Sequence, residues 1–190
     1  MQFSQQPDEE ALMKSALKLF MQKGYHNTSL RDICNKSNCT TGKFYIYFDS
    51  KISLFRLMVR NATDSIDAFV LKYIQALQNQ HHITLHDTQV VLLNVLSSTT
   101  FIHDIFAYRY AFFTLIRFAG ETDYTDYLSE TDYANYLGSS VAKVLRKCSK
   151  NNLYNLLYII PAQLDIVIRV ALTQVDSDIH AVIDRLKEIL

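Results

Sequence analysis

The sequence predicts an all-α protein, and three observations support this prediction. The 190 residues include only four glycines and two prolines, the residues that most often interrupt helices. Alternating runs of β-branched residues, which are typical of strands, are rare. Apolar side chains recur instead at intervals of three and four residues along most of the chain. Because 49% of the residues are hydrophobic, the helices can bury a sizeable core.

The first predicted helix spans residues 8–23. Leu12, Ala16 and Phe20 fall on one apolar stripe at helical spacing. Gly24 follows the last residue directly, where a C-terminal cap belongs. This helix is therefore expected to bury one face and expose the other.

Two short helices joined by a tight turn are predicted next, over about 29–36 and 40–46. Ser29 and Asp32 have the spacing of a capping box, which fixes the start of the first of them. Asn38 ends that helix and allows the turn. This arrangement is typical of a helix-turn-helix.

The second of these short helices has a distinctive first turn. Thr40, Thr41, Gly42 and Lys43 make it small, polar and cationic. Its back is expected to consist of Phe44, Tyr45 and Phe48, which would fix the helix by packing. Such a helix suits insertion into a DNA major groove, and the N–H groups at its N-terminus favour phosphate.

Further helices are predicted in the rest of the chain, over about 50–80, 87–98, 101–118, 133–148, 152–174 and 177–190. Residues 80–86 and the polar residues 120–132 are expected to connect neighbouring helices. The helix over 50–80 would be roughly 45 Å long, so it can carry a signal from one end of the molecule to the other.

Residues 9–56 resemble the DNA-binding head of TetR-type (tetracycline-repressor family) transcriptional regulators. The resemblance is carried by three strings in order, ALKLFMQKGYHNTSLRDIC, NCTTGKFYIYF and DSKISLF. Two positions depart from the family's pattern. Family members often have Lys or Arg in place of Thr41 and a second aromatic residue in place of Ile46.

The resemblance implies which side chains meet DNA. Thr41, Gly42 and Lys43 would lie near the bases, and Thr28, Tyr47 and Lys51 would hold the sugar–phosphate backbone. Together with Thr40 at the start of the short helix, these residues form the expected DNA-binding set. Glycine at position 42 would allow close approach of the backbone to DNA.

The chain is expected to divide into a helix-turn-helix domain over 1–50 and a helical effector-binding and dimerisation domain over 51–190. The net charge of the whole chain is zero. Residues 1–60, however, hold nine Lys and Arg against five Asp and Glu, whereas residues 61–190 hold ten against fourteen. A basic head and an acidic body are therefore compatible with DNA binding.

An aromatic cluster over 101–136 suggests an apolar cavity for a small hydrophobic effector, entered near the loop 120–132. The candidate residues are Phe101, Phe106, Tyr110, Phe113, Arg117 and Tyr133. Ordinary helix packing remains the alternative for each of them. The resemblance supports the cavity, because the bodies of the family usually house an effector.

The two C-terminal helices carry more apolar surface than a monomer needs. Pairing with a second copy would give an isologous four-helix bundle, which is also how the family dimerises. The candidate residues are Val167, Ile168, Ile179, Ile183 and Leu186.

No catalytic motif, cofactor motif or zinc spacing is present in the sequence, so neither an enzyme nor a cofactor is expected. His82 and His86 stand four residues apart, a spacing that could ligate a metal ion. We prefer the interpretation that they lie at the solvated end of a loop. Cys34, Cys39 and Cys148 are scattered, which is typical of a reducing cytoplasm. The sequence contains no apolar run of eighteen residues and no signal-peptide pattern, so we expect neither a membrane-spanning helix nor secretion.

These observations predict a homodimer whose heads bind a double-stranded, pseudo-palindromic operator and whose body binds a small hydrophobic effector. The effector would release DNA by changing the spacing of the two heads. Repression is implied by the resemblance. The alternative is a DNA-binding protein whose body docks a protein partner and has no small-molecule effector.

Overall fold

The computed structural model describes residues 7–78, 83–118, 133–147, 156–174 and 178–190. These residues form helices and contain no strand, which confirms the all-α fold. The helices are α1 (Pro7–Lys23), α2 (Leu30–Ser37), α3 (Thr41–Tyr47), α4 (Lys51–Gln78), α5 (Leu85–Ser98), α6 (Phe101–Ala107), α7 (Arg109–Phe118), α8 (Tyr133–Leu145), α9 (Leu156–Thr173) and α10 (Ile179–Ile189).

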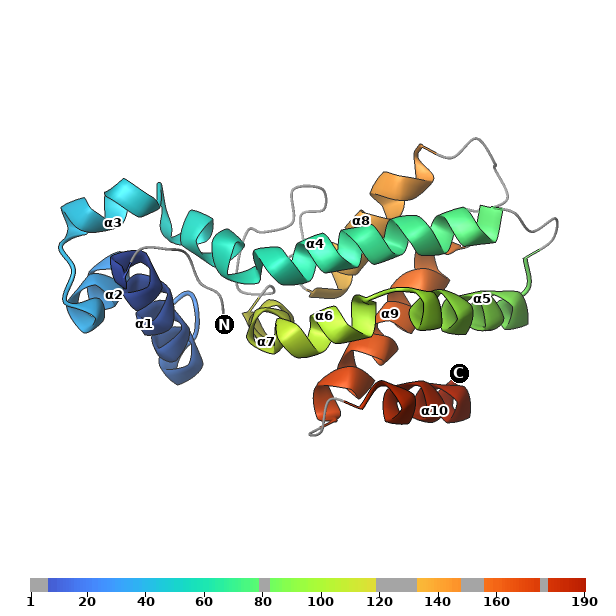
Figure 1. The fold of residues 1–190 in the computed structure, drawn as a ribbon. Coiled ribbons are helices and arrows are strands. Elements are labelled where there is room, and N and C mark those ends of the chain that lie inside the picture. The colour runs from blue at the N-terminus through green and yellow to red at the C-terminus, as the bar shows by residue number, and fades with distance from the viewer. Residues whose placement is uncertain (1–6, 79–82, 119–132, 148–155, 175–177) are drawn as a thin grey trace.

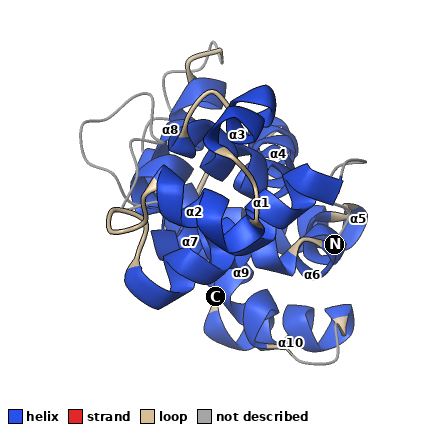
Figure 2. Cartoon of the chain, turned by 90° about the vertical axis from the view of Figure 1, so that its left-hand side faces the viewer, coloured by secondary structure: helices blue, strands red, loops and turns tan. Residues whose placement is uncertain are grey.

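The molecule is elongated (Figure 1). Helices α1, α2 and α3 form a head at one end, and α5 to α10 form a body at the other. Helix α4 leaves the head and runs along the body. In the view from the head end, α1, α2 and α3 lie in front of the body helices (Figure 2). The 28 residues of α4 give it a length of about 42 Å.

Four aromatic rings join the head to the body. Phe20 of α1 lies with its ring centroid 5.2 Å from Tyr25, 6.4 Å from Phe55 and 6.0 Å from Phe118. All four side chains are buried. Because Phe55 belongs to α4 and Phe118 to α7, the core of the head continues into the body, and the division at residues 50 and 51 stays a prediction.

A buried polar network ties three body helices together. The Tyr73 hydroxyl of α4 lies 2.7 Å from both the carbonyl oxygen of Thr88 in α5 and the side-chain oxygen of Gln163 in α9. The Gln163 amide donates in turn to the Thr88 hydroxyl at 3.0 Å. Burial raises the pKa of Tyr73, so its hydroxyl stays protonated. Each of these buried groups has a partner, as a stable interior requires.

Helix α9 is the most apolar of the described helices. Among the described residues it alone is long and apolar enough to cross a membrane, while α5 and α6 meet that criterion only as a pair bent by 62°. A core helix meets it too, and Ile160, Leu164 and Val167 are fully buried inside the body. The helix continues through Pro161.

The predicted single helix over 101–118 is wrong. The chain leaves the helix at Tyr108, so α6 and α7 are separate. The Tyr108 carbonyl accepts a hydrogen bond from the N–H of Ala111, in the first turn of α7. No Gly or Pro marks the break, and for this reason the apolar periodicity did not reveal it.

Candidate DNA-binding site

The start of α2 is fixed by a capping box. The Ser29 side chain accepts a hydrogen bond from the N–H of Asp32, and the Asp32 carboxylate accepts one from the N–H of Ser29 at 2.9 Å. Lys23, at the end of α1, donates to the same carboxylate at 2.8 Å. Lys23 and then Ser29 hold the pKa of Asp32 well below its usual range. These contacts orient α2 against α1.

The turn between α2 and α3 depends on Asn38. Its φ of 56° lies in the left-handed region, which asparagine tolerates better than most residues. The N–H of Cys39 then donates to the carbonyl of Cys34 at 3.0 Å and closes the turn. Cys34 is buried, and burial raises the pKa of its thiol. The two cysteines therefore act as packing and turn residues in this structure.

Helix α3 is held by its cap and by aromatic packing. The Thr40 hydroxyl accepts from the N–H of Lys43 at 3.1 Å, which makes Thr40 the N-cap residue. Phe44 is fully buried, and its ring lies 5.2 Å from that of Phe48. A helix of seven residues is not stable alone, so this packing is what keeps it folded.

The solvent-facing side of α3 is formed by Thr41, Gly42, Tyr45 and Ile46, which we call the α3 face. Tyr45 is 56% exposed and Ile46 is 75% exposed. The prediction that Tyr45 packs behind the helix is therefore wrong. Tyr45 follows Thr41 by four residues, and this spacing puts the two side chains on the same side of the helix.

Nothing in the described part of the protein requires glycine at position 42. Its backbone is helical, and a Cβ added there would meet only the Thr40 hydroxyl oxygen, at 3.9 Å. That distance is an ordinary van der Waals contact. The protein itself therefore leaves room for a side chain at the centre of the α3 face.

Lys43 is paired with a residue of the first helix. Its Nζ lies 2.6 Å from an oxygen of Asp8, at the start of α1, and both side chains are more than a third exposed. The Asp8 carboxylate raises the pKa of Lys43. Sequence reasoning missed this pair, because 35 residues separate its members and no local signal joins them.

Two residues of the expected DNA-binding set have structural roles within the head. Thr28 is fully buried, and its hydroxyl donates to the carbonyl of Gly24 at 2.7 Å. The Lys51 ammonium donates to the carbonyls of Tyr25 and Thr28 at 2.8 and 2.9 Å, and lies 4.1 Å from the centroid of the Tyr25 ring. The Thr28 side chain is thus inaccessible in the free protein. Lys51 links the start of α4 to the segment between α1 and α2. Tyr47 is half-buried against Phe48.

The structure separates the expected effector residues. Phe101 is buried and stacks on Phe69, with centroids 4.4 Å apart. Phe113 is partly exposed, and Arg117 lies over the ring of Phe118. Phe106 and Tyr110 line a cleft of about 640 Å³. The side chain of Tyr133 and the expected entrance loop 120–132 lie outside the described residues, so a cavity beside that loop stays a prediction.

The expected dimerisation residues fall into two groups, one buried in the core and one partly exposed. Val167, Ile168 and Leu186 are fully buried within one protomer, so they belong to its core. Ile179 and Ile183 are half-buried, and both line a hollow beside α5 and α6. An apolar stripe does not reveal whether its partner lies in the same chain.

Two further expectations concern histidine and cysteine. His86 is exposed in the first turn of α5. His82 and Cys148 lie outside the described residues. The preference for a solvated loop end over a metal site stays a prediction.

Comparison with known proteins finds similarity in the N-terminal part of the chain, which contains the helix-turn-helix. Residues 12–58 match the family described as "Bacterial regulatory proteins, tetR family". The chain is 45% identical over 51 residues to an uncharacterized HTH-type transcriptional regulator, YuxN, of Bacillus subtilis (strain 168), a match that covers 27% of this chain and 18% of the relative.

Two more relatives match a similar length. The HTH-type transcriptional regulator HbdR of Aromatoleum sp. (strain CIB) is 29% identical over 66 residues, which cover 35% of this chain and 29% of HbdR. IcaR of Staphylococcus aureus (strain Newman), a biofilm operon icaADBC HTH-type negative transcriptional regulator, is 30% identical over 63 residues, or 33% of this chain and 34% of IcaR. The chain thus spans about a third or less of these relatives.

The fold and the exposed face of α3 define a helix-turn-helix protein. Its N-terminal residues 12–58 are similar to the DNA-binding domain of TetR-type transcriptional regulators. This finding confirms the resemblance carried by the three sequence strings.

Proposed function

We propose that the protein binds a pseudo-palindromic operator as a homodimer and represses transcription until an effector releases it. The observation that carries the DNA-binding part is the α3 face, with small groups at Thr41 and Gly42 and a tyrosine and an isoleucine at its far end. Short polar groups read base edges, and an apolar side chain such as Ile46 suits a thymine methyl group.

The repressor part of the proposal is supported by one of the relatives. The printed name of IcaR describes a negative regulator. The relatives are named as transcriptional regulators, so we propose no enzymatic activity for this chain. Because operator DNA lies in the bacterial cytoplasm, the proposal assigns the protein to that compartment.

Helix α4 suits the coupling of body and head. Its first residues pack in the head core, and Tyr73 near its other end belongs to the buried network of the body. Two heads must meet successive major grooves about 34 Å apart. A small change in the angle of each α4 therefore alters the fit to both half-sites.

Gly42→Ala is expected to separate DNA binding from stability. The extra methyl group fits the free protein and favours a helix, so the free energy of unfolding should stay the same or rise by up to about 1 kcal/mol. If the backbone of Gly42 closely approaches DNA, affinity for a selected operator should fall at least about tenfold, a loss of about 1.4 kcal/mol. Fluorescence anisotropy and urea unfolding measure the two effects.

Gly138→Ala is the matched control for this experiment. Gly138 lies in α8, and a Cβ there would meet nothing within 4 Å. Both substitutions add the same methyl group to a helix. Unchanged operator binding by Gly42→Ala would contradict the proposed contact.

Asp8→Asn is expected to strengthen DNA binding severalfold. The substitution removes a carboxylate that pairs with Lys43 and that would also repel nearby phosphates. The gain should shrink in the Lys43→Ala background and at high salt, because both partners are exposed and screened. Asp64→Asn is the control, since it removes the same charge from Asp64, which pairs with Arg60 on α4 in a more exposed setting. Equal effects of the two substitutions would contradict a specific role of Asp8.

A further inference from the structure

Two free cysteines occupy the turn of the helix-turn-helix. Helix α2 ends in a Schellman motif, because the N–H of Cys39 donates to the carbonyl of Cys34 at 3.0 Å. The N–H of Asn38 donates likewise to the carbonyl of Asn35 at 3.4 Å. The cysteines hold the two positions of this motif whose side chains frequently meet. Cys34 is buried in the core cluster of the protein, and Cys39 packs against that cluster.

The backbone of the turn holds the two cysteines within reach of a disulfide. Since the 3.0 Å hydrogen bond joins the Cys34 carbonyl to the Cys39 N–H, standard bond lengths keep their Cα atoms no more than about 7 Å apart. Disulfides span Cα separations of about 4.4–6.8 Å. An S–S bond of about 2 Å is shorter than any contact between unbonded sulfur atoms. Closing the bridge would therefore pull the two residues toward each other.

The two thiols differ in exposure, and this difference sets the order in which they react. Cys39 is partly exposed, and its thiol donates to the carbonyl of Ser37 at 3.6 Å. Burial raises the pKa of the Cys34 thiol, and the nearby Cys39 raises it further. An oxidant can therefore reach Cys39 first, while Cys34 is shielded from solvent and placed to react second.

The bridge would act on the residues that begin the α3 face. Cys39 directly precedes Thr40, the N-cap residue of α3. A hydrogen bond with the Thr41 side chain opposes the effect of burial on the pKa of Cys34, so Cys34 contacts the first residue of α3. To join, the sulfur atoms must leave their present partners, Thr41 and the Ser37 carbonyl. A bridge would therefore displace the start of α3.

We propose that Cys34 and Cys39 form a reversible disulfide when a peroxide oxidises Cys39, and that this disulfide lowers operator affinity by displacing the start of α3. The effect on DNA rests on the proposed DNA-binding function. The bridge itself is a property of the turn and does not depend on that function. Transient, redox-sensing disulfides are the kind that a reducing cytoplasm allows.

The reaction consumes one hydrogen peroxide for each bridge. The Cys39 thiolate attacks one peroxide oxygen, the O–O bond breaks, and the released hydroxide takes up the thiol proton to leave as water. The Cys34 thiolate then attacks the sulfur of the resulting sulfenic acid. The S–S bond forms, the S–O bond breaks, and the hydroxide leaves with the Cys34 proton as a second water. The two thiols lose two electrons, which reduce the peroxide.

Peptide mapping of the full chain after treatment with hydrogen peroxide tests the bridge. Trypsin cleaves after Arg31, Lys36 and Lys43, so it separates the two cysteines into peptides 32–36 and 37–43. Treated wild-type protein should yield these two peptides joined, and dithiothreitol should separate them. Cys148→Ser, which removes the third cysteine, should yield the same pair. Unlinked peptides, or Cys39 bridged to Cys148, would overturn the proposal.

Operator titrations before and after peroxide treatment test the effect on DNA. Affinity of the wild-type protein and of Cys148→Ser should fall at least about tenfold, the size of one lost base contact, and dithiothreitol should restore it. Cys39→Ser and Cys34→Ala, each compared with its own untreated sample, should change by less than about twofold. Methionine oxidation is common to all four proteins, so these variants exclude it as the cause.

Each outcome of the titrations decides one part of the account. Either cysteine variant alone suffices if the other fails to fold. A linked peptide pair with unchanged operator affinity would overturn the regulatory part, as would an equal loss of affinity in Cys39→Ser or Cys34→Ala. If the untreated wild-type protein selects no operator, the proposed function fails, whereas the peptide map still decides whether the bridge forms.

Discussion

Phe44→Ala is expected to cost about 3–5 kcal/mol of stability and to abolish operator binding at 37 °C. Phe44 is fully buried and packs against Phe48 behind the α3 face. A seven-residue helix has too few hydrogen bonds to remain folded without this anchor. Urea unfolding followed by circular dichroism gives the loss of stability, and anisotropy on a selected operator gives the loss of binding.

Tyr45→Ala is the matched control, since Tyr45 is the next residue and is 56% exposed. Its removal should change stability by no more than about 0.5 kcal/mol. Operator affinity should nevertheless fall, because Tyr45 belongs to the α3 face. If Tyr45→Ala destabilised the protein as much as Phe44→Ala, the orientation of α3 described above would be wrong.

Tyr158→Glu is expected to convert a dimer into a monomer. Tyr158 is 84% exposed on α9, although this helix has a mean hydropathy of 1.7. An exposed aromatic side chain on such a helix suits the centre of an interface between two copies. Burying a carboxylate there should raise the dimer dissociation constant at least about 30-fold, or about 2 kcal/mol. Sedimentation velocity over a concentration series measures the change.

The control for this experiment is Val90→Glu. Val90 is a 44% exposed apolar residue of α5. This variant should remain dimeric, so a general effect of a new surface charge is excluded. A wild-type protein that is monomeric at micromolar concentration, or a Tyr158→Glu variant as dimeric as wild type, would contradict the proposed interface.

The helix-turn-helix was predictable because its signals are local. Ser29 and Asp32 cap α2 within four residues, and Asn38 ends the helix as the sequence suggested, in a left-handed conformation. The amphipathic spacing of α1 likewise depends on neighbours along the chain. The misplaced Tyr45 shows the limit of grouping aromatic residues by type, since consecutive helical residues point about 100° apart.

The roles that were missed depend on residues far apart in the sequence. Lys51 reaches carbonyls 26 and 23 positions earlier, and Lys43 meets Asp8 across the head. Val167 and Leu186 carry apolar side chains that suit a dimer face and a protomer core equally well. Only the packing of the helices decides between these uses.

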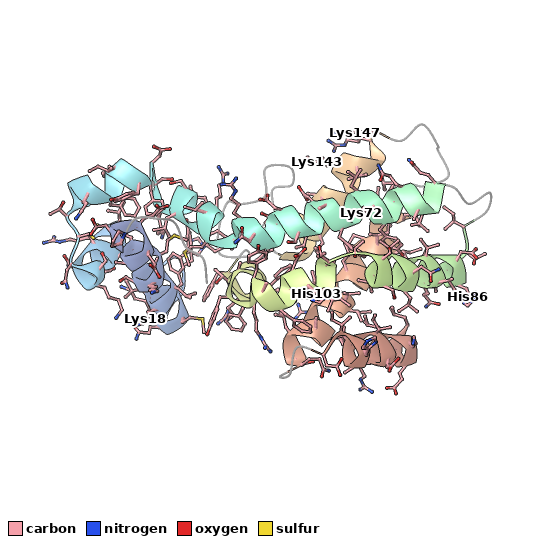
Figure 3. All side chains as sticks on the ribbon, in the orientation of Figure 1. Lys18, Lys72, His86, His103, Lys143 and Lys147 are labelled. Atoms are coloured by element: carbon pink, nitrogen blue, oxygen red, sulfur yellow. The ribbon has the colours of Figure 1, made fainter. Side chains whose placement is uncertain are left out.

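Lysines of the body provide a charge control for Lys43 in the proposed recognition helix. Figure 3 labels Lys72 on α4, Lys143 on α8 and Lys147 just after the end of α8, all in the body, away from α1, α2 and α3. Removing Lys72 changes the net charge as much as removing Lys43 does. Comparing the two variants therefore separates recognition from general attraction to DNA.

Selection of duplexes from a random DNA library, with wild-type protein, Lys43→Ala and Lys72→Ala, tests the central proposal most directly. Wild type and Lys72→Ala should enrich the same pseudo-palindrome, with half-sites about one helical turn apart. Lys43→Ala should bind that operator about tenfold or more weakly and relax the preference at one position in each half-site. No enriched sequence with wild type, or an unchanged sequence and affinity with Lys43→Ala, would contradict recognition of DNA by α3.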